Sequence, residues 1–414
     1  MIVHRPSGSA RPAFVPCASL VLALLLAAPP ARAADLAERA RTLVGADQGV
    51  YVEAEDGTVL VAQQAARPVH PASVSKVPTT LALLRALGPA HRFETRFAAG
   101  GPLRDGRIDG PLVVAAAGDP FFVDENALLV AQALREAGVR EVAGGLVVQG
   151  PLLFDWESEA AGPRLRRALA GGAPAAAWQA VRAQGGGDGA PPALHFTGGT
   201  VPAKASPVTL VTHRSEPLIP LLKALNGYSN NIFAALAQAA GGIAAVQADV
   251  RGILPEAWRE ELILGDGAGA HRRNRMSPRA TVAILRALEA ELARHGRTLA
   301  DALPVAGVDD GTLRHRLDGP GERGVVVAKT GTYGSYGACA LAGALRTERR
   351  GIVYFAVLNR GVPVEPARRR QDAFVRALLT ELGALPWGYQ RDDTPAFARA
   401  EVFGDSPGDP AIRR

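Results

Sequence analysis

Short runs rich in β-branched and apolar residues occur near the start and near the end of the chain, and they predict five strands. In order, these predicted strands are residues 50–54, 58–62, 324–330, 338–345 and 351–358. The first two flank Glu55-Asp56-Gly57, which is typical of a hairpin turn. Two early and three late strands fit one antiparallel sheet, so we expect the ends of the chain to come together, with helices from the middle covering the sheet.

Apolar residues recur at helical spacing after the predicted hairpin and again near the end of the chain. Leu81, Leu84 and Leu87 predict a helix whose first turn contains Pro78, where a missing N–H costs little. Residues 366–382 predict a second helix with one apolar face. These helices are expected to pack on the sheet.

The segment from residue 96 to residue 205 interrupts this plan. It is predicted to contain strands at 110–117 and 142–148 and a helix at 126–137. Gly, Ala and Pro dominate residues 170–192, which predicts a flexible connection or a disordered loop. We therefore expect an inserted smaller domain.

The domain boundaries follow from these changes along the chain. A mature chain of about 380 residues is longer than one compact core usually accommodates, which predicts two lobes. Residues 34–95 and 206–389 are assigned to the larger domain and residues 96–205 to the inserted domain. Residues 390–414, rich in Arg, Asp and Pro, are expected to form a flexible tail.

The first 33 residues have the pattern of a secretory signal peptide. Arg5 and Arg11 precede an apolar run at 18–28, and Ala31-Arg32-Ala33 fits a cleavage site before Ala34. The apolar run is too short for a resident transmembrane helix, although an uncleaved anchor is the rival interpretation. We expect a periplasmic or otherwise exported protein with no integral membrane span in its mature chain.

Cleavage changes the charge and the cysteine content. Residues 1–33 contain three arginines and no acid, so the formal net charge falls from +6 to +3, which gives no strong case for nucleic-acid binding. Cleavage also removes Cys17, which precedes the apolar run and so disfavours a lipoprotein. Cys339 then remains alone, and no internal disulfide is expected.

Lysine is scarce in this chain. Only four of the 46 basic residues are lysines, at positions 76, 204, 223 and 329. A lysine amine can lose its proton when it is buried or placed near another cation, whereas arginine stays protonated. A lysine in this sequence is therefore more informative than usual.

Two of these lysines belong to a recurring set of motifs. Ser73 and Lys76 are three positions apart, which places both on one helix face, where a neutral amine can take the proton of a serine nucleophile. Ser229-Asn230-Asn231 supplies S-x-N, and residues 329–332 read K-T-G-T. These three motifs, in this order, are the signature of penicillin-binding proteins and serine β-lactamases.

Taken with their flanking segments, the motifs resemble the class C low-molecular-mass penicillin-binding proteins, the D-alanyl-D-alanine carboxypeptidase/endopeptidase family. The similarity covers most of the mature chain and includes "PASVSKVPTT", "GDPFF", "GGLVVQGPLLF", "LILGDGAGAHRRNRMSPRA" and "LPVAGVDDGTLRHRL". The resemblance implies an α/β fold of the α+β type, like that of serine β-lactamases and penicillin-binding-protein transpeptidases. In that fold a five-stranded antiparallel sheet is flanked by helices.

The resemblance also implies a role for each catalytic position. Ser73 attacks the carbonyl between two D-alanines and forms an acyl-enzyme, and Lys76 accepts its proton. Ser229 passes that proton to the leaving amine, and Asn231 orients the substrate amide. Lys329 maintains the electrostatics near Ser229, and no metal or cofactor is needed.

Substrate contacts are implied in the same way. Thr330 would bind the terminal carboxylate, and the N–H groups of Ser73 and Thr332 would form the oxyanion hole. Gly331 lets the substrate backbone approach the strand. Arg272 would bind an acidic group of the stem peptide, or it would make a surface salt bridge. The implied partners are peptidoglycan stem peptides, with β-lactam antibiotics as covalent inhibitors.

Several positions depart from the family pattern. Only 156 positions separate Ser73 from Ser229, which indicates a shortened insertion. Ala268 stands where serine is usual, and Ala235 stands where an acid commonly follows S-x-N. These departures leave open the balance between D-Ala-D-Ala carboxypeptidase activity and endopeptidase activity on D-Ala-diaminopimelate cross-links.

Three alternative functions use the same motifs. A class A β-lactamase needs a further acid for deacylation, and residues 232–248 contain no Asp or Glu. An esterase would use the same serine and lysines. A catalytically weak penicillin- or peptidoglycan-binding protein would retain the fold with little turnover.

Overall fold

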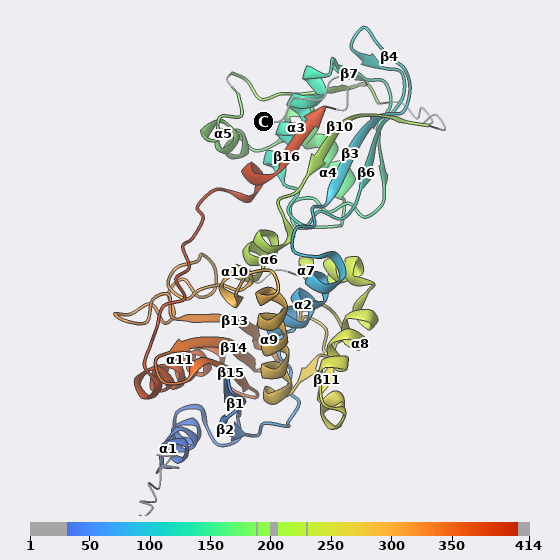
Figure 1. The fold of residues 1–414 in the computed structure, drawn as a ribbon. Helices are drawn as coiled ribbons and strands as arrows, with labels where there is room; N and C mark the ends of the chain where they lie inside the picture. Colours follow the sequence, from blue (N-terminus) through green and yellow to red (C-terminus); the bar gives the residue numbers. More distant parts are fainter. Residues whose placement is uncertain (1–30, 188, 199–205, 229–230, 405–414) are drawn as a thin grey trace, which may run out of the picture.

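The computed structural model describes residues 31–187, 189–198, 206–228 and 231–404. Two lobes lie one above the other along the long axis of the molecule (Figure 1). The larger lobe contains the main sheet, which combines strands from early and late parts of the chain. The smaller lobe contains the inserted segment. Residues 1–30 of the predicted signal peptide lie outside the described residues, and so does Ser229 of the S-x-N motif. Helix α1 (Ala31–Arg39) begins within the predicted cleavage site.

The main sheet confirms the predicted pairing of early and late strands. Its order is β13-β14-β15-β1-β2, and every neighbouring pair is antiparallel. The strands are β1 (Gly49–Ala54), β2 (Val59–Gln63), β13 (Val326–Tyr333), β14 (Ala338–Thr347) and β15 (Gly351–Asn359). Strand β13, which contains the K-T-G-T motif, therefore forms an edge of this sheet.

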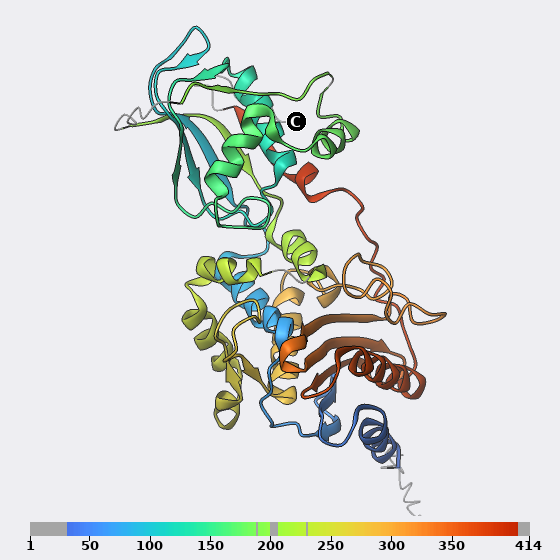
Figure 2. The same cartoon turned by 180° about the vertical axis from the view of Figure 1, so that it is seen from behind.

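Helices cover both faces of the main sheet because its strands are apolar on both sides. Val50 and Val52 of β1 share one core with Phe374 of α11 (Val364–Leu382). Tyr51, between them in sequence, belongs to the other core, on the side of α2 (Lys76–Leu87) and α9 (Pro278–Ala293). The two predicted helices are thus present, one on each face (Figures 1 and 2).

Shorter elements complete the larger lobe. They are η1 (Ala40–Val44), η2 (Ala72–Ser75), α6 (Leu218–Gly227), α7 (Ile232–Leu236), η4 (Ala237–Ala240), α8 (Ile243–Ile253), η5 (Glu256–Glu261), β11 (Leu262–Ile263), β12 (Arg275–Met276), α10 (Leu299–Ala302) and η6 (Gly334–Tyr336). Helices α6, α8 and α9 contribute apolar residues to the same core as α2, so the nucleophile helix is enclosed by other helices and one sheet face.

The smaller lobe is built on a second five-stranded sheet, in the order β16-β10-β3-β6-β8. Its strands are β3 (Glu94–Ala99), β6 (Leu112–Ala116), β8 (Leu146–Gln149), β10 (Val208–Arg214) and β16 (Glu401–Gly404). A sheet of two-residue strands adjoins it, formed by β4 (Leu103–Arg104), β5 (Arg107–Ile108), β7 (Glu141–Val142) and β9 (His195–Phe196). The helical elements are α3 (Asp124–Glu136), α4 (Ala161–Arg167), η3 (Ala168–Gly172) and α5 (Ala175–Ala183).

Two expectations for the inserted segment are wrong in detail. The strand predicted at 142–148 is split into β7 and β8, because Gly144 packs so closely on Pro111 that a Cβ would lie 2.9 Å from the proline nitrogen. The region predicted to be flexible contains helix α5. Trp178 and Val181 of this helix are buried at helical spacing, within a composition that otherwise resembles a linker.

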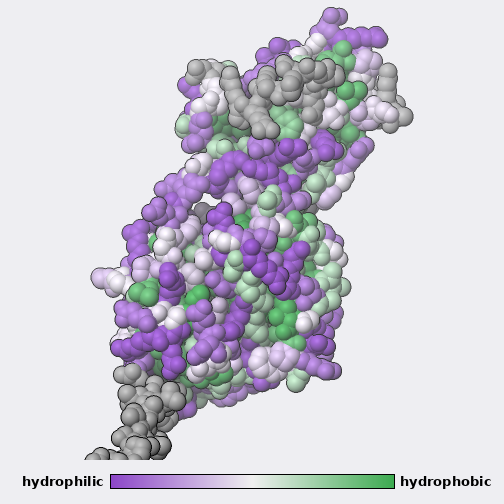
Figure 3. Space-filling view, viewed as in Figure 1, coloured by the Kyte–Doolittle hydropathy of each residue, from purple (hydrophilic) through white to green (hydrophobic). Residues whose placement is uncertain are grey.

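The flexible tail expected from residue 390 onward instead contains regular secondary structure as far as residue 404. Residues 390–404 run from the larger lobe to the smaller lobe and contain η7 (Ala396–Arg399) before β16 (Figures 1 and 2). Strand β16 pairs with β10 along Val211–Arg214. This segment, which we call the C-terminal strap, therefore ties the lobes together across a largely hydrophilic junction (Figure 3).

Within the described part of the chain, no single helix has both the length and the apolar composition to cross a membrane. The segments Ile232–Ala240 and Ile243–Ile253 meet those criteria only as a pair, bent by 73°.

The strap depends on an ion pair between Arg399 and the buried carboxylate of Glu216. We expect Arg399→Ala to destabilise the protein by about 3 kcal/mol, because it leaves a buried charge without its partner. The exposed pair of Arg41 and Glu38 provides a control, and Arg41→Ala is expected to cost at most about 0.5 kcal/mol. Chemical denaturation of both variants measures the difference, and equal losses would contradict this role of the strap.

Candidate active site

The nucleophile candidate Ser73 lies in a tight turn that leads into α2. It is the second residue of η2, and its side chain is buried. The preceding residue, Ala72, has a φ of +48°, in the left-handed region that costs a non-glycine residue on the order of 1–2 kcal/mol. The turn is therefore held in place by its surroundings.

Two glycines provide the space for this turn. A Cβ added to Gly331 of β13 would lie 2.5 Å from the Pro71 carbonyl oxygen. A Cβ added to Gly269 would lie 2.0 Å from the Ala72 carbonyl oxygen, and Gly269 itself has a φ of +90°. The glycine of K-T-G-T thus has a packing role that sequence reasoning missed, while its predicted role in substrate approach stays a prediction.

Lys76 is brought directly to Ser73. Its Nζ donates a hydrogen bond of 2.9 Å to the Ser73 Oγ and another of 2.5 Å to the carbonyl oxygen of Ala268. The side chain is completely buried, and burial lowers the pKa of Lys76 from 10.5 to about 8, although Asp266 partly opposes this shift. A neutral amine is therefore accessible to Ser73 near physiological pH.

Asp266 organises the loop that carries the Ala268 carbonyl. Its carboxylate accepts hydrogen bonds from three backbone N–H groups and one side-chain amide, those of Gly269, Ala270, His271 and Asn274. Sequence reasoning did not assign Asp266 a role, although the D-G-x-G pattern was visible. Ala268 meets Lys76 through its backbone, so the alanine at this position leaves that contact intact.

Lys329 supplies a second buried amine. It lies on β13, and its Nζ donates to the Thr330 carbonyl oxygen at 2.9 Å. Burial, reinforced by the nearby charge of Lys76, lowers the pKa of Lys329 to about 7. Because protonated Lys76 disfavours the charged form of Lys329, the pair does not readily hold two protons.

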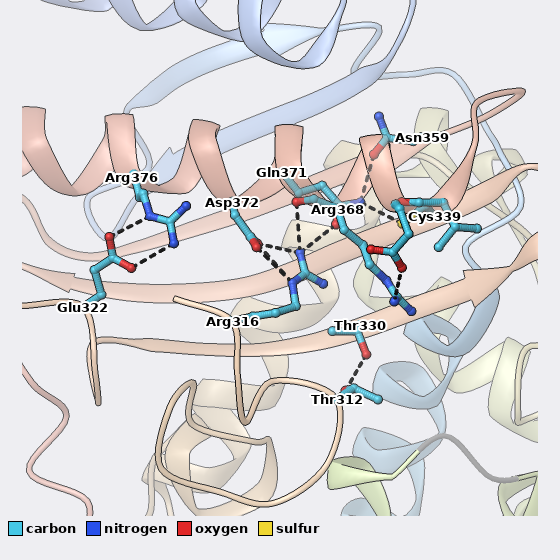
Figure 4. A network of polar contacts seen from close by, with 12 residues as sticks. Thr312, Arg316, Glu322, Thr330, Cys339, Asn359, Arg368, Gln371, Asp372 and Arg376 are labelled. Carbon is cyan, nitrogen blue, oxygen red and sulfur yellow. Dashed lines mark hydrogen bonds and ion pairs between the residues drawn. The ribbon is translucent and has the colours of Figure 1, made fainter. Parts of the chain in front are cut away.

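The threonines of K-T-G-T lie on the opposite side of the strand from Lys329 and Gly331, as strand alternation requires. The Thr330 Oγ1 donates to the Thr312 Oγ1 at 2.6 Å, and the Thr332 Oγ1 accepts from Arg368 of α11 at 3.1 Å. Figure 4 shows Arg368 reaching from the helix toward this strand. Sequence reasoning missed both Thr312 and Arg368.

Arg272 lies near Tyr336 of η6, just beyond the end of β13 that carries Thr332. It is exposed, and its guanidinium carbon lies 5.6 Å from the ring centre of Tyr336. Tyr336 stacks on Tyr333, which stacks on His70, with ring centres 5.1 and 4.9 Å apart. Arg272 therefore caps an aromatic stack, and its predicted contact with an acidic group of a substrate stays a prediction.

Part of the S-x-N motif is described. Asn231 is exposed and immediately precedes helix α7, and Phe233 of that helix places its ring centre 5.7 Å from the Lys76 Nζ. Gly227, two residues before Ser229, packs closely against Gly311, and its carbonyl oxygen accepts a hydrogen bond from the backbone N–H of Thr312 at 3.1 Å. The three motifs thus converge on one region, although Ser229 lies outside the described residues.

In the described ranges, no group of three or more His, Cys, Asp or Glu side chains is arranged to hold a metal ion. The chemistry that these residues support directly is nucleophilic attack by a hydroxyl with an amine as base.

The fold and the convergence of these motifs define the class of serine acyl-transfer enzymes that includes penicillin-binding proteins and β-lactamases. The chain belongs to the D-Ala-D-Ala carboxypeptidase 3 (S13) family, which it matches over residues 31–162 and 196–381. The family expected from the sequence motifs is therefore confirmed.

Individual relatives agree with this assignment. A D-alanyl-D-alanine carboxypeptidase of Actinomadura sp. (strain R39) is 31% identical over 201 residues, which are 46% of this chain and 35% of that relative. A predatory endopeptidase of Bdellovibrio bacteriovorus, solved with an immunity protein, has a TM-score of 0.70 at 22% identity, covering 84% of this chain and 96% of its own. Penicillin-binding protein 4 of Haemophilus influenzae, solved with a β-lactam, has a TM-score of 0.60 at 22% identity, covering 86% and 100%. These structures confirm the fold.

The Lys76–Ser73 contact predicts that acylation requires the lysine amine. We expect Lys76→Met and Lys76→Arg each to lower the rate of labelling by a fluorescent penicillin by about 10²–10⁴-fold, because neither replacement can act as the base. Lys223→Met is the matched control, since Lys223 is largely buried with a pKa lowered to about 8 but is paired with Asp309.

Circular dichroism would first establish that all three variants are folded. Rapid labelling of a folded Lys76→Met protein would show that another group is the base.

Proposed function

We propose that the protein is an exported serine DD-peptidase that hydrolyses the D-Ala-D-Ala bond of peptidoglycan stem peptides. The observation that carries this proposal is the hydrogen bond of 2.9 Å between the Lys76 Nζ and the Ser73 Oγ, made by a buried amine with a lowered pKa. Family membership adds the substrate class, since the S13 family is described as D-Ala-D-Ala carboxypeptidases.

Acylation begins when the Ser73 oxygen bonds to the carbonyl carbon of the penultimate D-alanine. The hydroxyl proton passes to neutral Lys76, and the carbonyl oxygen takes the negative charge that the N–H groups of Ser73 and Thr332 stabilise. The C–N bond then breaks, and the leaving amine receives a proton through Ser229. Asn231 orients the substrate amide.

Deacylation reverses the roles of the reacting groups. Water attacks the ester carbonyl and gives a proton to the neutral amine of Lys76. The bond between that carbonyl carbon and the Ser73 oxygen then breaks, and the protonated amine returns a proton to the Ser73 oxygen. Lys329 maintains the electrostatics of the site while Lys76 is neutral, because a protonated Lys76 disfavours a proton on Lys329. A β-lactam follows the first half of this route, which would make it a covalent inhibitor.

One solved neighbour supports this route through its chemistry. It is an endopeptidase of Bdellovibrio bacteriovorus that was solved in the form acylated by penicillin G. The same comparison supports a second substrate, the D-Ala-diaminopimelate cross-link, because the Bdellovibrio enzymes are described as endopeptidases. Export follows from the proposed substrate, which lies outside the cytoplasm, and from the predicted signal peptide cleaved near Ala33–Ala34.

Labelling by a fluorescent penicillin, combined with D-alanine release from a stem pentapeptide, tests the proposal. The wild-type protein is expected to be labelled and to release D-alanine, and Ser73→Ala is expected to lose both activities. Ser75→Ala is the matched control, because Ser75 is also buried in η2 and, among the described residues, its hydroxyl has no hydrogen-bond partner.

Each other outcome identifies a different function. Labelling without D-alanine release would favour the catalytically weak penicillin-binding protein, and rapid release of hydrolysed penicillin would favour a β-lactamase. Cleavage of simple esters alone would favour an esterase. Labelling that persists in Ser73→Ala would contradict the assigned nucleophile.

A further inference from the structure

His70 lies two residues before the strained residue of the nucleophile turn, and no motif pointed to it. Its Nδ1 accepts a hydrogen bond from the backbone N–H of Ala72 at 3.1 Å, and its Nε2 lies 3.2 Å from the carbonyl oxygen of His271. The residue is only 7% exposed. Both nitrogens of a buried ring are therefore bonded to backbone groups around Ser73.

The two partners determine which ring nitrogen carries the proton. A backbone N–H only donates and a carbonyl oxygen only accepts, so Nδ1 is unprotonated and Nε2 carries the hydrogen. Burial lowers the pKa of His70 below its ordinary value of 6.5, and the charge of Arg275 acts in the same direction. The hydrogen bond to His271 and the charge of Asp266 oppose this shift. The net shift keeps the ring neutral at pH 7 and above.

The bond to Ala72 holds one side of the strained backbone. Ala72 has a φ of +48°, and its carbonyl oxygen lies so close to Gly269 that a Cβ there would be only 2.0 Å away. Its N–H is thus held by the imidazole, while its carbonyl group is enclosed by the loop at Gly269. Because the Ala72 carbonyl and the Ser73 N–H belong to one planar peptide group, fixing the first also directs the second.

The bond to His271 joins the turn to the loop that carries Ala268. The N–H of His271 donates to the Asp266 carboxylate at 2.9 Å, and the Ala268 carbonyl of the same loop accepts from Lys76. His70 therefore connects the backbone around the nucleophile with the loop that holds the amine.

Packing and strand-like pairing keep the imidazole in this position. Its ring stacks on Tyr333 of β13, with ring centres 4.9 Å apart and an angle of 15° between the planes. Val69, the residue before it, pairs with Met276 through backbone hydrogen bonds of 3.0 and 2.9 Å. The ring is thus held both through its face and through the chain that carries it.

We propose that His70 is a positioning residue for acylation, whose neutral imidazole holds the Ala72 N–H and so aims the hydroxyl and the N–H of Ser73. This inference rests on the proposed function, because it takes Ser73 as the nucleophile. His70 acts through the backbone and contacts no reacting atom. Without an acceptor at Nδ1, the Ala72 N–H is a buried donor lacking its partner, and the turn is released from its unfavourable φ.

The test replaces His70 by Asn or by Phe and measures acylation by a penicillin in a stopped-flow experiment. The side-chain oxygen of Asn can accept from the N–H two residues later, so His70→Asn is expected to keep the acylation rate constant within about threefold. Phe keeps a stacking ring but has no acceptor, and His70→Phe is expected to lower this rate constant by about 10- to 100-fold. The dissociation constant of the non-covalent penicillin complex is expected to change less than about twofold in both variants.

His91→Phe is the matched control. His91 is also partly buried against an aromatic ring, that of Phe93 with ring centres 4.8 Å apart, and burial lowers its pKa too. This variant is expected to be acylated like the wild-type protein. Circular dichroism would establish that all three variants are folded before their rates are compared.

A spectroscopic measurement on the wild-type protein applies even if His70→Phe does not fold. Nitrogen-15 NMR of the imidazole rings near neutral pH, assigned by comparison with His70→Asn, is expected to show His70 with its proton on Nε2 alone. A proton on Nδ1 would overturn the positioning role.

The outcomes separate this inference from the proposed function. An acylated wild-type protein overturns the role of His70 alone if His70→Phe reacts equally fast, or if His70→Asn loses as much rate as His70→Phe. A folded wild-type protein that is not acylated by penicillin overturns the proposed function, and this inference with it.

Discussion

The structure depends on a lysine amine that is buried against a serine hydroxyl. Lowering the pKa of Lys76 from 10.5 to about 8 corresponds to about 3 kcal/mol of stability lost below pH 8, where the unfolded chain binds the proton more tightly. The carboxylate of Asp266 keeps this shift smaller than burial alone would make it. A site under selection for stability alone would not keep such a group, which is why its burial indicates chemistry.

The rest of the larger lobe holds that contact in place. The turn at Ser73 has an unfavourable backbone at Ala72, and it fits only because Gly331 and Gly269 let β13 and the Asp266 loop come close. Since β13 comes from the end of the chain and Ser73 from its beginning, the five-stranded sheet is what brings the nucleophile and Lys329 together. The C-terminal strap then connects this lobe to the inserted one.

Much of this arrangement was predictable because it follows local patterns. Alternating apolar residues gave the five strands, and motif order gave Ser73, Lys76 and Lys329. The strap was missed because β16 has only four residues and gains its stability from pairing with β10, nearly 190 positions away. Helix α5 was missed because its alanines, with the glycines of the flanking segments, resemble a linker, and only the burial of Trp178 and Val181 in the fold stabilises the helix.

Interactions between side chains on different helices, strands and loops were the least predictable part of the structure. Nothing in the local sequence relates Arg368 to Thr332, which meet by a hydrogen bond, or Asp266 to Lys76, whose pKa it influences, since both pairs come together only in the folded chain. The aromatic stack of His70, Tyr333 and Tyr336 has the same origin. Local patterns therefore identified the reacting groups, while tertiary packing determines what surrounds them.

The most direct test of the central claim is an NMR titration of the lysine side chains, for which this chain is well suited because it contains only four lysines. Selective ¹³C labelling, with Lys76→Met to assign the signal, would follow the protonation of Lys76 itself. Burial predicts a midpoint near pH 8, with the neutral amine increasing as the pH rises through that value. A midpoint near the ordinary value of 10.5 in the folded protein would contradict the account.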